Sequence, residues 1–411
     1  MDYFPSLTPL TPPHSEEERL SWLRLLRSRR VGVATFYRLM AEHGSAQAAL
    51  AALPGVAAAA GVAGYEVCPL GVVMAEMKAG RLAGAQLLCA GAADYPAALS
   101  DLADSPPLLW AIGDLSILER PSVALVGARN ASSLGTRMAR KMADELGQAG
   151  NVVVSGLARG IDTAAHIGAL PHGTIAVMAG GVDAIYPAEN AVLAQEIIEN
   201  GLRISEQPMG LQPQARHFPR RNRIISGIVR GVVVVEAATK SGSLITARDA
   251  LDQGREVLAV PGHPFDARAA GCNMLIRDGA TLVRSAADVI AALGVVSKTV
   301  EGHTAPVVGE TDRTAANATD KSQTPVASNT PKPSRPTAGD APAGKAKPRL
   351  SLRGAHSLHL RILDRLGPSP LAEDQLIRDL ALSAKDVTPE LVTLELDGKI
   401  ARQPGGLLTK L

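Results

Sequence analysis

The stretch VALVGARNASSLG, residues 123–135, decides the fold. Its first four residues are apolar, a glycine-containing turn follows them, and a helical pattern begins directly after the turn. A short β-branched run that ends in glycine and leads into a helix predicts a buried β-strand followed by a helix. Short β-branched runs that end in glycine or polar residues and lead into a helical pattern recur from Ser122 to about residue 295, so this strand-helix unit is repeated along the middle of the chain.

Seven strands of this kind are expected to alternate with helices. They are Val123–Val126, Val152–Ser155, Thr174–Met178, Leu202–Ser205, Val232–Glu236, Val257–Val260 and Thr281–Arg284. Near-continuous apolar strands separated by helices indicate a parallel sheet that is covered on both faces. The sequence therefore predicts an α/β fold with an extended Rossmann-like, doubly wound parallel sheet. The ligand site of such a sheet lies outside the carboxyl ends of its strands.

The first two predicted strands end in turns that suit an anion. Gly127 and Arg129 stand where a helix opens, so backbone amides, the positive helix end and a guanidinium fork are all available to a phosphate. The second turn offers a similar set, Ser155, Gly156, Arg159 and Gly160. An ordinary packing loop of an α/β protein is the alternative. The glycines do not form Gly-x-Gly-x-x-Gly and the second strand does not end in an acid, so no dinucleotide or other cofactor is expected.

The densest positive charge lies in the segment Arg216-His-Phe-Pro-Arg-Arg-Asn-Arg223, before or within the first turn of an expected helix. Cations at a helix N-terminus oppose the helix dipole, so a row of incoming phosphates would explain their concentration there. The candidate binding residues in this segment are Phe218, Pro219, Arg221, Asn222 and Arg223. A solvated basic face is the alternative, and some of these arginines are expected to pair with Glu206 or Glu236 instead.

A further anion site is expected after the fifth strand, where a helix begins beside Lys240. Its hydroxyl and amide donors belong to Ser241, Gly242, Ser243 and Thr246. After the third strand, Tyr186 either stacks on a base or staples its own loop. The segment Val260–Pro264 follows the sixth strand and is expected to border the same site.

Asp162 and His166, four residues apart on one helical face, raise the question of metal binding or acid/base chemistry. No third ligand is visible, so we interpret His166 as a helix histidine with satisfied hydrogen bonds, and no metal site is expected.

The flanking segments predict the remaining domain organisation. Residues 1–100 are expected to form a small helical domain, of the helix-hairpin-helix or SAM-like kind, where DNA contact is an alternative to plain packing. The Rossmann-like domain is assigned to 105–295. A disordered linker is assigned to 296–350, which is rich in Thr, Pro, Ala and Lys. Residues 351–411 show three helical stretches and the turn Pro404-Gly-Gly406, the order of a winged helix. The third helix is acidic, which favours a protein contact or structural role over duplex reading.

Composition narrows the class of protein. A net charge of +2 neither demands nor excludes a polyanionic partner, and 3% aromatic residues predict sparing base stacking. The three cysteines form no Cys-x-x-Cys pair, so neither a disulfide framework nor a zinc site is supported, and a reduced cytoplasm fits. The chain starts without a signal pattern, and no apolar stretch reaches the ~20 residues needed to cross a bilayer. A cytoplasmic protein without membrane contact is expected.

Five motifs carry a family resemblance. They are Gly-Ala-Arg at 127–129, Ser-Gly-Leu-Ala-Arg-Gly-Ile-Asp at 155–162, Tyr-Pro at 186–187, Phe-Pro-Arg-Arg-Asn-Arg-Ile-Ile-Ser-Gly at 218–227 and Ser-Gly-Ser-Leu-Ile-Thr at 241–246. Together they resemble the bacterial DNA-processing protein A (DprA/Smf) family over about residues 105–295. The flanking helical and winged-helix domains look like those that often accompany this core.

The resemblance implies a dimeric, extended Rossmann domain that binds incoming single-stranded DNA during natural transformation, protects it and helps to load the RecA recombinase. It implies no catalysis. By position, Arg129 would be a principal DNA-contacting arginine, and the loops at Ser155, Phe218–Arg223 and Ser241 would complete the pocket. Some members carry a lysine directly after Tyr-Pro, where this chain has Ala188, so Arg159 or Arg220 would have to supply that phosphate contact. Few aromatics in the domain predict binding dominated by phosphates, tolerant of sequence and weakened by salt.

Two other functions remain as alternatives. Rossmann-like hydrolases that release the base of a nucleoside monophosphate bind phosphate on similar loops, but they resemble a Gly-Gly-x-Gly-Thr-x-x-Glu pattern. Here the comparable turn has Thr246 where the catalytic glutamate would stand, and the spacing of the acidic residues reveals no acid/base pair. A nucleotide-sensing module is the other alternative. We therefore predict a DNA-binding protein rather than an enzyme.

Overall fold

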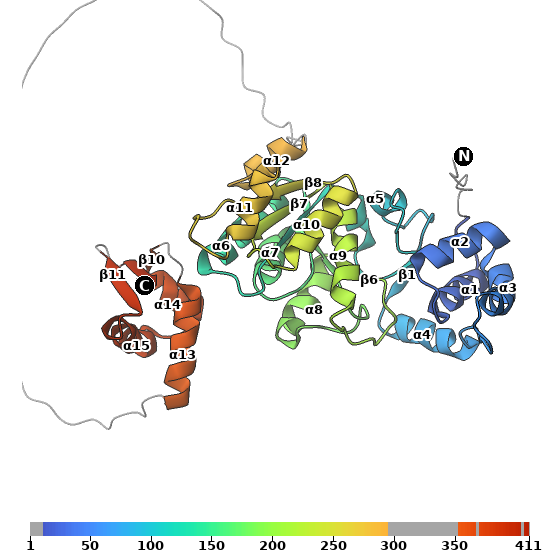
Figure 1. Cartoon of the computed structure of the whole chain (residues 1–411), viewed down its shortest axis with the longest axis horizontal. Helices are drawn as coiled ribbons and strands as arrows, with labels where there is room; N and C mark the ends of the chain where they lie inside the picture. Colours follow the sequence, from blue (N-terminus) through green and yellow to red (C-terminus); the bar gives the residue numbers. More distant parts are fainter. Residues whose placement is uncertain (1–10, 295–351, 367–369, 404–406, 411) are drawn as a thin grey trace, which may run out of the picture. The chain divides into compact units, whose positions relative to one another are not determined.

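The computed structural model describes residues 11–294, 352–366, 370–403 and 407–410. Residues 11–294 form a group of helices and a nine-stranded sheet, and residues 352–410 form a second, small α/β unit (Figure 1). The predicted linker and the predicted turn at 404–406 lie outside the described residues.

Four helices come first in the chain: α1 Glu16–Arg27, α2 Val33–His43, α3 Ala46–Ala59 and α4 Leu70–Leu82. A capping box starts α1, because the Ser15 hydroxyl accepts from the Glu18 amide at 3.1 Å while the Glu18 carboxylate accepts from the Ser15 amide at 3.3 Å. Buried Trp22 and Phe36 hold α1 against α2, with ring centroids 5.2 Å apart in an edge-to-face arrangement.

The large sheet has the strand order β1-β2-β6-β5-β4-β3-β7-β8-β9. Its strands are β1 Gln86–Cys89, β2 Leu108–Gly113, β3 Ser122–Gly127, β4 Val152–Ser155, β5 Thr174–Val177, β6 Leu202–Ser205, β7 Gly231–Glu236, β8 Glu256–Ala259 and β9 Thr281–Leu282. The seven predicted strands, β3 to β9, are parallel to one another. The predicted parallel sheet is confirmed. Its strand order reverses between β3 and β7, where ligands of such sheets bind.

Two strands were not predicted. β1 and β2 pair antiparallel with each other, and β2 pairs antiparallel with β6. The sheet therefore begins at residue 86, and the expected helical domain of residues 1–100 is too long at its carboxyl end. The apolar run Leu87–Ala90 follows a helix after one short turn, and a short apolar run does not distinguish a strand from a buried helix segment.

Helices cover both faces of the parallel sheet, as the doubly wound prediction requires. One face packs against α6 Ser133–Gln148, α7 Ile161–Ala169, α8 Ala191–Asn200 and α12 Ala286–Leu293. The other packs against α9 His217–Gly227, α10 Ser243–Asp252 and α11 Ala270–Arg277. The short elements are α5 Ala97–Ser100, η1 Leu115–Glu119, η2 Leu170–His172 and η3 Ala188–Asn190. Alternate strand residues supply the two cores: Leu125 and Val153 face α6 and α7, whereas Val126 and Val154 face the α9 side.

Glu76 of α4 ties the first helices to the sheet. Its buried carboxylate accepts hydrogen bonds from Arg27 of α1, at 3.0 and 2.8 Å, and from the Trp110 indole of β2 at 2.8 Å. Gly80 allows this contact, because a Cβ there would lie 2.4 Å from the Trp110 ring. The helices and the sheet thus share one hydrophobic core.

The small unit contains α13 Leu352–Arg365, α14 Glu373–Leu380 and α15 Ala384–Leu396, with strands β10 Leu371–Ala372, β11 Ile400–Gln403 and β12 Leu407–Lys410. Its antiparallel sheet has the order β10-β12-β11. Ile362, Leu376, Leu391 and Leu408 are fully buried at its centre. This is the predicted winged helix.

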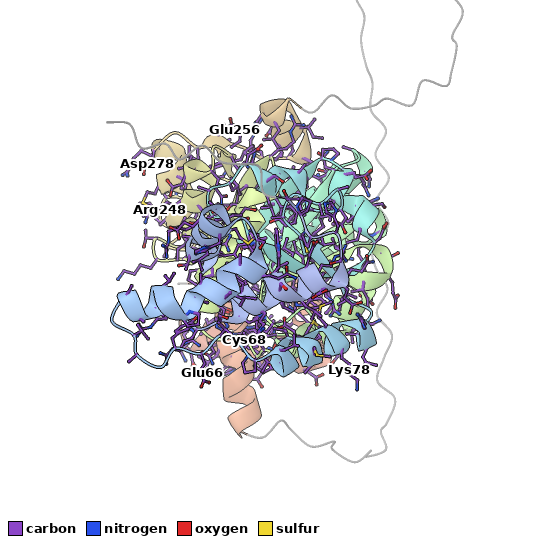
Figure 2. The ribbon with its side chains drawn as sticks, turned by 90° about the vertical axis from the view of Figure 1, so that its right-hand side faces the viewer. Glu66, Cys68, Lys78, Arg248, Glu256 and Asp278 are labelled. Carbon is purple, nitrogen blue, oxygen red and sulfur yellow. The ribbon has the colours of Figure 1, made fainter. Side chains whose placement is uncertain are left out.

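The three cysteines are free and buried. Figure 2 labels Cys68 in the helical part of the chain. Burial raises the pKa of the Cys89 and Cys272 thiols to about 12, so both stay protonated and unreactive at neutral pH. None of the helices in the described residues is both long and apolar enough to span a membrane.

Candidate nucleic-acid interface

A cavity of about 790 Å³ opens at the carboxyl ends of β3 and β7, where the strand order reverses. The turn after β3, the turn after β7 and the start of α9 form its walls. Most of the predicted residues line it: Gly127, Arg129, Phe218, Pro219, Arg221, Asn222, Ser241, Gly242, Ser243 and Thr246. The parallel sheet thus brings three segments, each far from the others in sequence, to one site.

Arg221 is the most deeply buried cation of this site, with 5% of its surface exposed. Its guanidinium lies against Gly156, where a Cβ would come within 1.2 Å of Nη1. Neither Nε nor Nη1 finds a hydrogen-bond partner among the described residues. Burial and the nearby charge of Arg129 lower the pKa of Arg221 to about 10, which leaves it charged at neutral pH. A buried guanidinium whose N–H groups lack partners among the described residues is a donor set that suits a phosphate.

Asp162 orders the turn that carries Gly156. Its buried carboxylate accepts from the backbone amides of Gly156 at 3.1 Å and Ala158 at 3.4 Å. Burial raises the pKa of Asp162, while the positive charge of Arg221 and these two bonds oppose the rise. The carboxylate therefore holds the wall of the cavity and balances part of the charge of Arg221.

His166 of α7 is fully buried behind this turn. Its Nε2 accepts from the Leu157 amide at 3.3 Å, and its Nδ1 lies 2.9 Å from the Thr174 hydroxyl. Burial, with the charge of Arg221, lowers the pKa of His166 to about 3, so the ring is neutral at physiological pH. The interpretation of His166 as a helix histidine with satisfied hydrogen bonds is confirmed.

Three side chains form a stack at the edge of the cavity. The Arg129 guanidinium lies 4.8 Å from the centre of the Phe218 ring, and the Tyr186 ring lies 5.8 Å from Phe218 on centroids. Behind the stack is a second cavity of about 220 Å³, lined by Arg129, Gly156, Ala158, Arg159, Tyr186, Pro187, Glu189 and Phe218. Exposed Ala188 begins η3 directly after Pro187. Arg159 lines this cavity with Arg129, and its guanidinium forms an exposed pair with Glu189 at 3.6 Å.

The start of α10 forms the opposite wall. The hydroxyls of Ser241 and Ser243 lie 2.7 Å apart, and no side chain caps the helix at Gly242. The Ser243 amide donates to the Ser241 hydroxyl at 3.4 Å, and the Leu244 and Ile245 amides each donate at 3.1 Å to the carbonyls of Ser241 and Gly242, so the serine hydroxyls rather than these amides are the donors that this wall offers to an anion. Lys240 also lines the cavity, as do Ala128, Ala158, Asp162, Tyr186, Pro213, Ala215, Ile225, Ala238 and Ile245, which were not among the candidate residues. The small apolar ones carry no sequence signal for binding.

Three predicted residues support the loops rather than line the large cavity. The Ser155 hydroxyl donates to the Leu125 carbonyl at 2.7 Å inside the sheet. Gly160, with φ +78°, packs so closely that a Cβ would lie 2.3 Å from the Ala128 carbonyl oxygen. Arg223 pairs with Glu206 and Asp104. The expected pairing of an arginine of this segment with Glu206 is confirmed.

Glu236, the other partner considered for these arginines, forms bonds elsewhere. Its carboxylate accepts from the Ser132 amide at 2.9 Å and from the Ser132 hydroxyl, at the N-terminus of α6. Gly135 makes room for it, because a Cβ there would lie 2.4 Å from Oε2. Burial raises the pKa of Glu236, and the Ser132 bonds counteract part of the rise. The anion expected at the start of α6 is thus a carboxylate of the chain itself.

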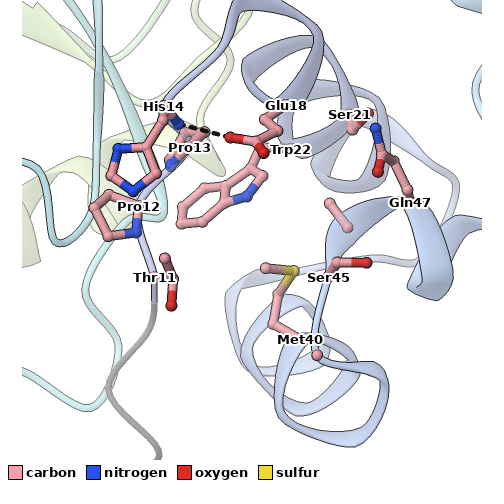
Figure 3. A pocket seen from close by; sticks show the side chains of 12 residues that line it. Thr11, Pro12, Pro13, His14, Glu18, Ser21, Trp22, Met40, Ser45 and Gln47 are labelled. Carbon is pink, nitrogen blue, oxygen red and sulfur yellow. Dashed lines mark hydrogen bonds between the residues drawn. The ribbon is translucent and has the colours of Figure 1, made fainter.

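Another cavity, of about 150 Å³, lies between the start of α1 and the α2–α3 turn (Figure 3). Pro12, Pro13, Trp22 and Met40 form much of its wall, and neither lysine nor arginine lines it. It therefore does not suit a phosphate. The described part of the chain contains no cluster of three or more His, Cys, Asp or Glu residues that would bind a metal ion.

Family comparisons cover all three parts of the chain. The model described as DNA recombination-mediator protein A matches residues 86–294. A DprA-like N-terminal HHH domain matches residues 16–79, and a DprA winged helix domain matches residues 345–406.

Individual relatives agree with these matches. The DNA processing protein DprA of Streptococcus pneumoniae is 48% identical over 199 residues, which are 48% of this chain and 70% of that protein. Protein Smf of a Synechocystis strain is 35% identical over 76% of this chain and 77% of its own length. The X-ray structure of the Streptococcus pneumoniae protein superposes with a TM-score of 0.53 and 34% identity, covering 70% of this chain and 93% of the other. The chain therefore belongs to the DNA recombination-mediator protein A (DprA/Smf) family.

Proposed function

We propose that this protein binds single-stranded DNA by holding its phosphates in the cavity between β3, β7 and α9. The observation that carries the proposal is Arg221, a buried guanidinium with unpartnered N–H groups in a cavity that Arg129 and Lys240 also line. Charged hydrogen bonds to a phosphate would satisfy those groups. Arg221 lines the cavity with 5% of its surface exposed, so a phosphate must enter the cavity to reach it, which a flexible single strand allows more readily than a rigid duplex.

The candidate contacts are the predicted ones. Arg129, Arg221 and Asn222 would meet phosphates directly, and Ser241, Gly242, Ser243 and Thr246 would donate from the start of α10. Phe218 and Tyr186 would stack on one base beside the Arg129 guanidinium, and Arg159 would take the next phosphate in place of the family lysine.

We further propose a role without catalysis in natural transformation, in which a homodimer formed through the Rossmann-like domain protects incoming DNA in the cytoplasm and helps to load the RecA recombinase. The family description as a recombination mediator supports this role. The absence of catalysis is supported by the acidic groups near the cavity, since Asp162 and Glu236 both accept bonds from the backbone and His166 is buried and neutral.

The test is a fluorescence-anisotropy titration of the full chain with a labelled oligothymidylate and with a duplex of equal length, at two salt concentrations. Arg129→Ala is compared with Arg140→Ala, an exposed arginine of α6 that lines neither cavity, so both variants lose one positive charge. We expect preference for the single strand, weaker binding at higher salt and a loss of affinity in Arg129→Ala alone.

Equal affinity for the single strand and the duplex would contradict the proposal. Equal losses of affinity in Arg129→Ala and Arg140→Ala would also contradict it. Incubation with nucleoside monophosphates separates it from the hydrolase alternative, because free base released at enzyme-like turnover would favour a hydrolase. A strand-exchange assay with RecA, on DNA coated by a single-strand-binding protein, tests the loading step.

A further inference from the structure

Exposed aromatic rings occur on two loops of the sheet. Among the Phe, Tyr and Trp side chains of the described residues, Tyr186 and Phe265 are the two that are largely exposed, at 48% and 89%. Tyr186 follows β5 and Phe265 follows β8, so both lie at the carboxyl edge of the parallel strands. Tyr186 lines the cavity with Arg129, Arg221 and Lys240, which opens at the β3 and β7 ends, and Phe265 lies outside it, after the next strand β8.

Local hydrogen bonds fix the loop that presents Phe265. The Asp266 amide donates to the His263 carbonyl at 2.9 Å, and the Phe265 amide donates to His263 Nδ1 at 3.3 Å. Asn273 of α11 clamps the base of the loop, because its side chain accepts from the Gly262 amide at 3.2 Å and donates to the Gly262 carbonyl at 3.1 Å. The Phe265 and His263 rings are 5.6 Å apart on centroids. The exposed ring is therefore presented by an ordered turn.

This loop adjoins one wall of the cavity. The Gly271 amide, at the start of α11, donates to the Ala237 carbonyl at 2.7 Å, and Ala237 leads directly to Lys240. From β5 to β8 the sheet has four strand spacings, which at about 4.8 Å each amount to about 19 Å. That length corresponds to about six nucleotides at the duplex rise of ~3.4 Å and to fewer in an extended strand.

We propose that Phe265 stacks on a nucleobase and that the single-stranded DNA site extends from the Tyr186 side of the sheet, across the cavity, to the loop after β8. This inference rests on the proposed function. Phosphates lie in the cavity, and Phe265 holds a base outside it, several nucleotides away from the Tyr186–Phe218 stack. Stacking on any base accounts for an exposed ring in a site that does not read sequence.

A length series with the Phe265→Ala variant tests the inference. Oligothymidylates of about 4 and about 12 nucleotides, within the range of known single-strand site sizes, are titrated against the full chain. We expect Phe265→Ala to bind the longer oligomer about tenfold more weakly than the unaltered chain and the shorter one equally well. Leu251→Ala is the matched control, since Leu251 is a 60% exposed apolar residue of α10 outside the cavities. It should bind both lengths normally.

Phe265→Trp gives an independent readout. The chain's two tryptophans, Trp22 and Trp110, are 3% and 2% exposed, so a change of emission on DNA binding would come from the new indole. We expect quenching by the longer oligomer and none when the contacted nucleotide is abasic. Normal binding of every length by Phe265→Ala, with unchanged emission of Phe265→Trp, would overturn the inference. If the unaltered chain binds single strands through Arg129 in that case, the proposed function still stands.

Discussion

Two buried nitrogen atoms of Arg221 have no hydrogen-bond partner among the described residues. A buried polar group without a partner costs about 1–3 kcal/mol, and Nε and Nη1 of Arg221 find none in the part of the chain that the structure describes. We predict that Arg221→Gln lowers single-strand affinity about 10- to 100-fold, because a hydrogen bond to a charged group contributes about 1.5–3 kcal/mol. Anisotropy titrations measure this. Arg140→Gln, which removes an exposed arginine of α6 outside both cavities, is the control, and equal losses in both variants would contradict the role of Arg221.

His166 predicts an acid-labile fold. Its pKa falls from its ordinary 6.5 to about 3 in the folded chain, so the unfolded chain binds more protons between these values. The neutral ring therefore contributes stability that is present above pH 6.5 and is lost as the pH falls toward 3, by up to about 1.4 kcal/mol per pH unit. In urea unfolding, we expect the free energy of unfolding of His166→Gln to fall less between pH 6 and 4.5 than that of the unaltered chain. If the free energy of unfolding of both proteins fell equally over this pH range, His166 would not be the source of the acid lability.

The start of α6 shows how one element closes a site. Glu236 places a carboxylate where a helix N-terminus otherwise attracts an anion. We predict that Glu236→Ala loses about 1–3 kcal/mol of stability and that inorganic phosphate then raises its melting temperature, because phosphate takes the vacated position. Glu236→Gln, which keeps a side-chain oxygen beside the Ser132 amide and vacates no position, should respond to phosphate no more than the unaltered chain does. An equal response of the unaltered chain would show that Glu236 does not close this helix end.

Local patterns predicted the elements and their turns well. Each strand from β3 to β9 is a β-branched or apolar run with a turn after it, and in a parallel sheet those turns must share one edge. The sequence therefore identified Arg129, Arg221 and Ser241 as neighbours before the structure did. It did not identify the bond from Ser132 to Glu236, which joins residues 104 positions apart, and it expected a pair with Glu206 without indicating which arginine would form it. Which partner a charged side chain chooses depends on packing that no local pattern encodes.

At the scale of the whole molecule, Glu76 makes the first helices and the sheet one body in residues 11–294. Removing one partner of a buried ion pair costs about 3–5 kcal/mol, and Glu76→Ala also leaves the Trp110 indole without its acceptor. We predict a loss of that size in urea unfolding followed by tryptophan emission. Glu42→Ala breaks an exposed pair with Arg38 and should cost at most about 0.5 kcal/mol. Similar losses in both variants would mean that Glu76 does not join the two parts.

The extent of the large sheet was less predictable than its individual strands and helices. Periodicity indicated a helical region, a parallel sheet and a winged helix, but not that β1 and β2 extend the sheet by antiparallel pairing. β1 and β2 are short and lie outside the repeated strand-helix units of β3 to β9. Their pairing is decided by the exposed edge of β6, which belongs to a segment about 90 residues further along the chain.

The most direct measurement of the central claim is the salt dependence of single-strand affinity. Each phosphate contact on a single strand contributes about 0.7 to the slope of log K against log salt concentration. For the double variant Arg129→Ala/Lys240→Ala we predict a slope shallower than that of the unaltered chain by about 1.4, with the folded circular dichroism spectrum retained. An unchanged slope would show that these residues, and the cavity they line, do not hold the phosphates of the strand.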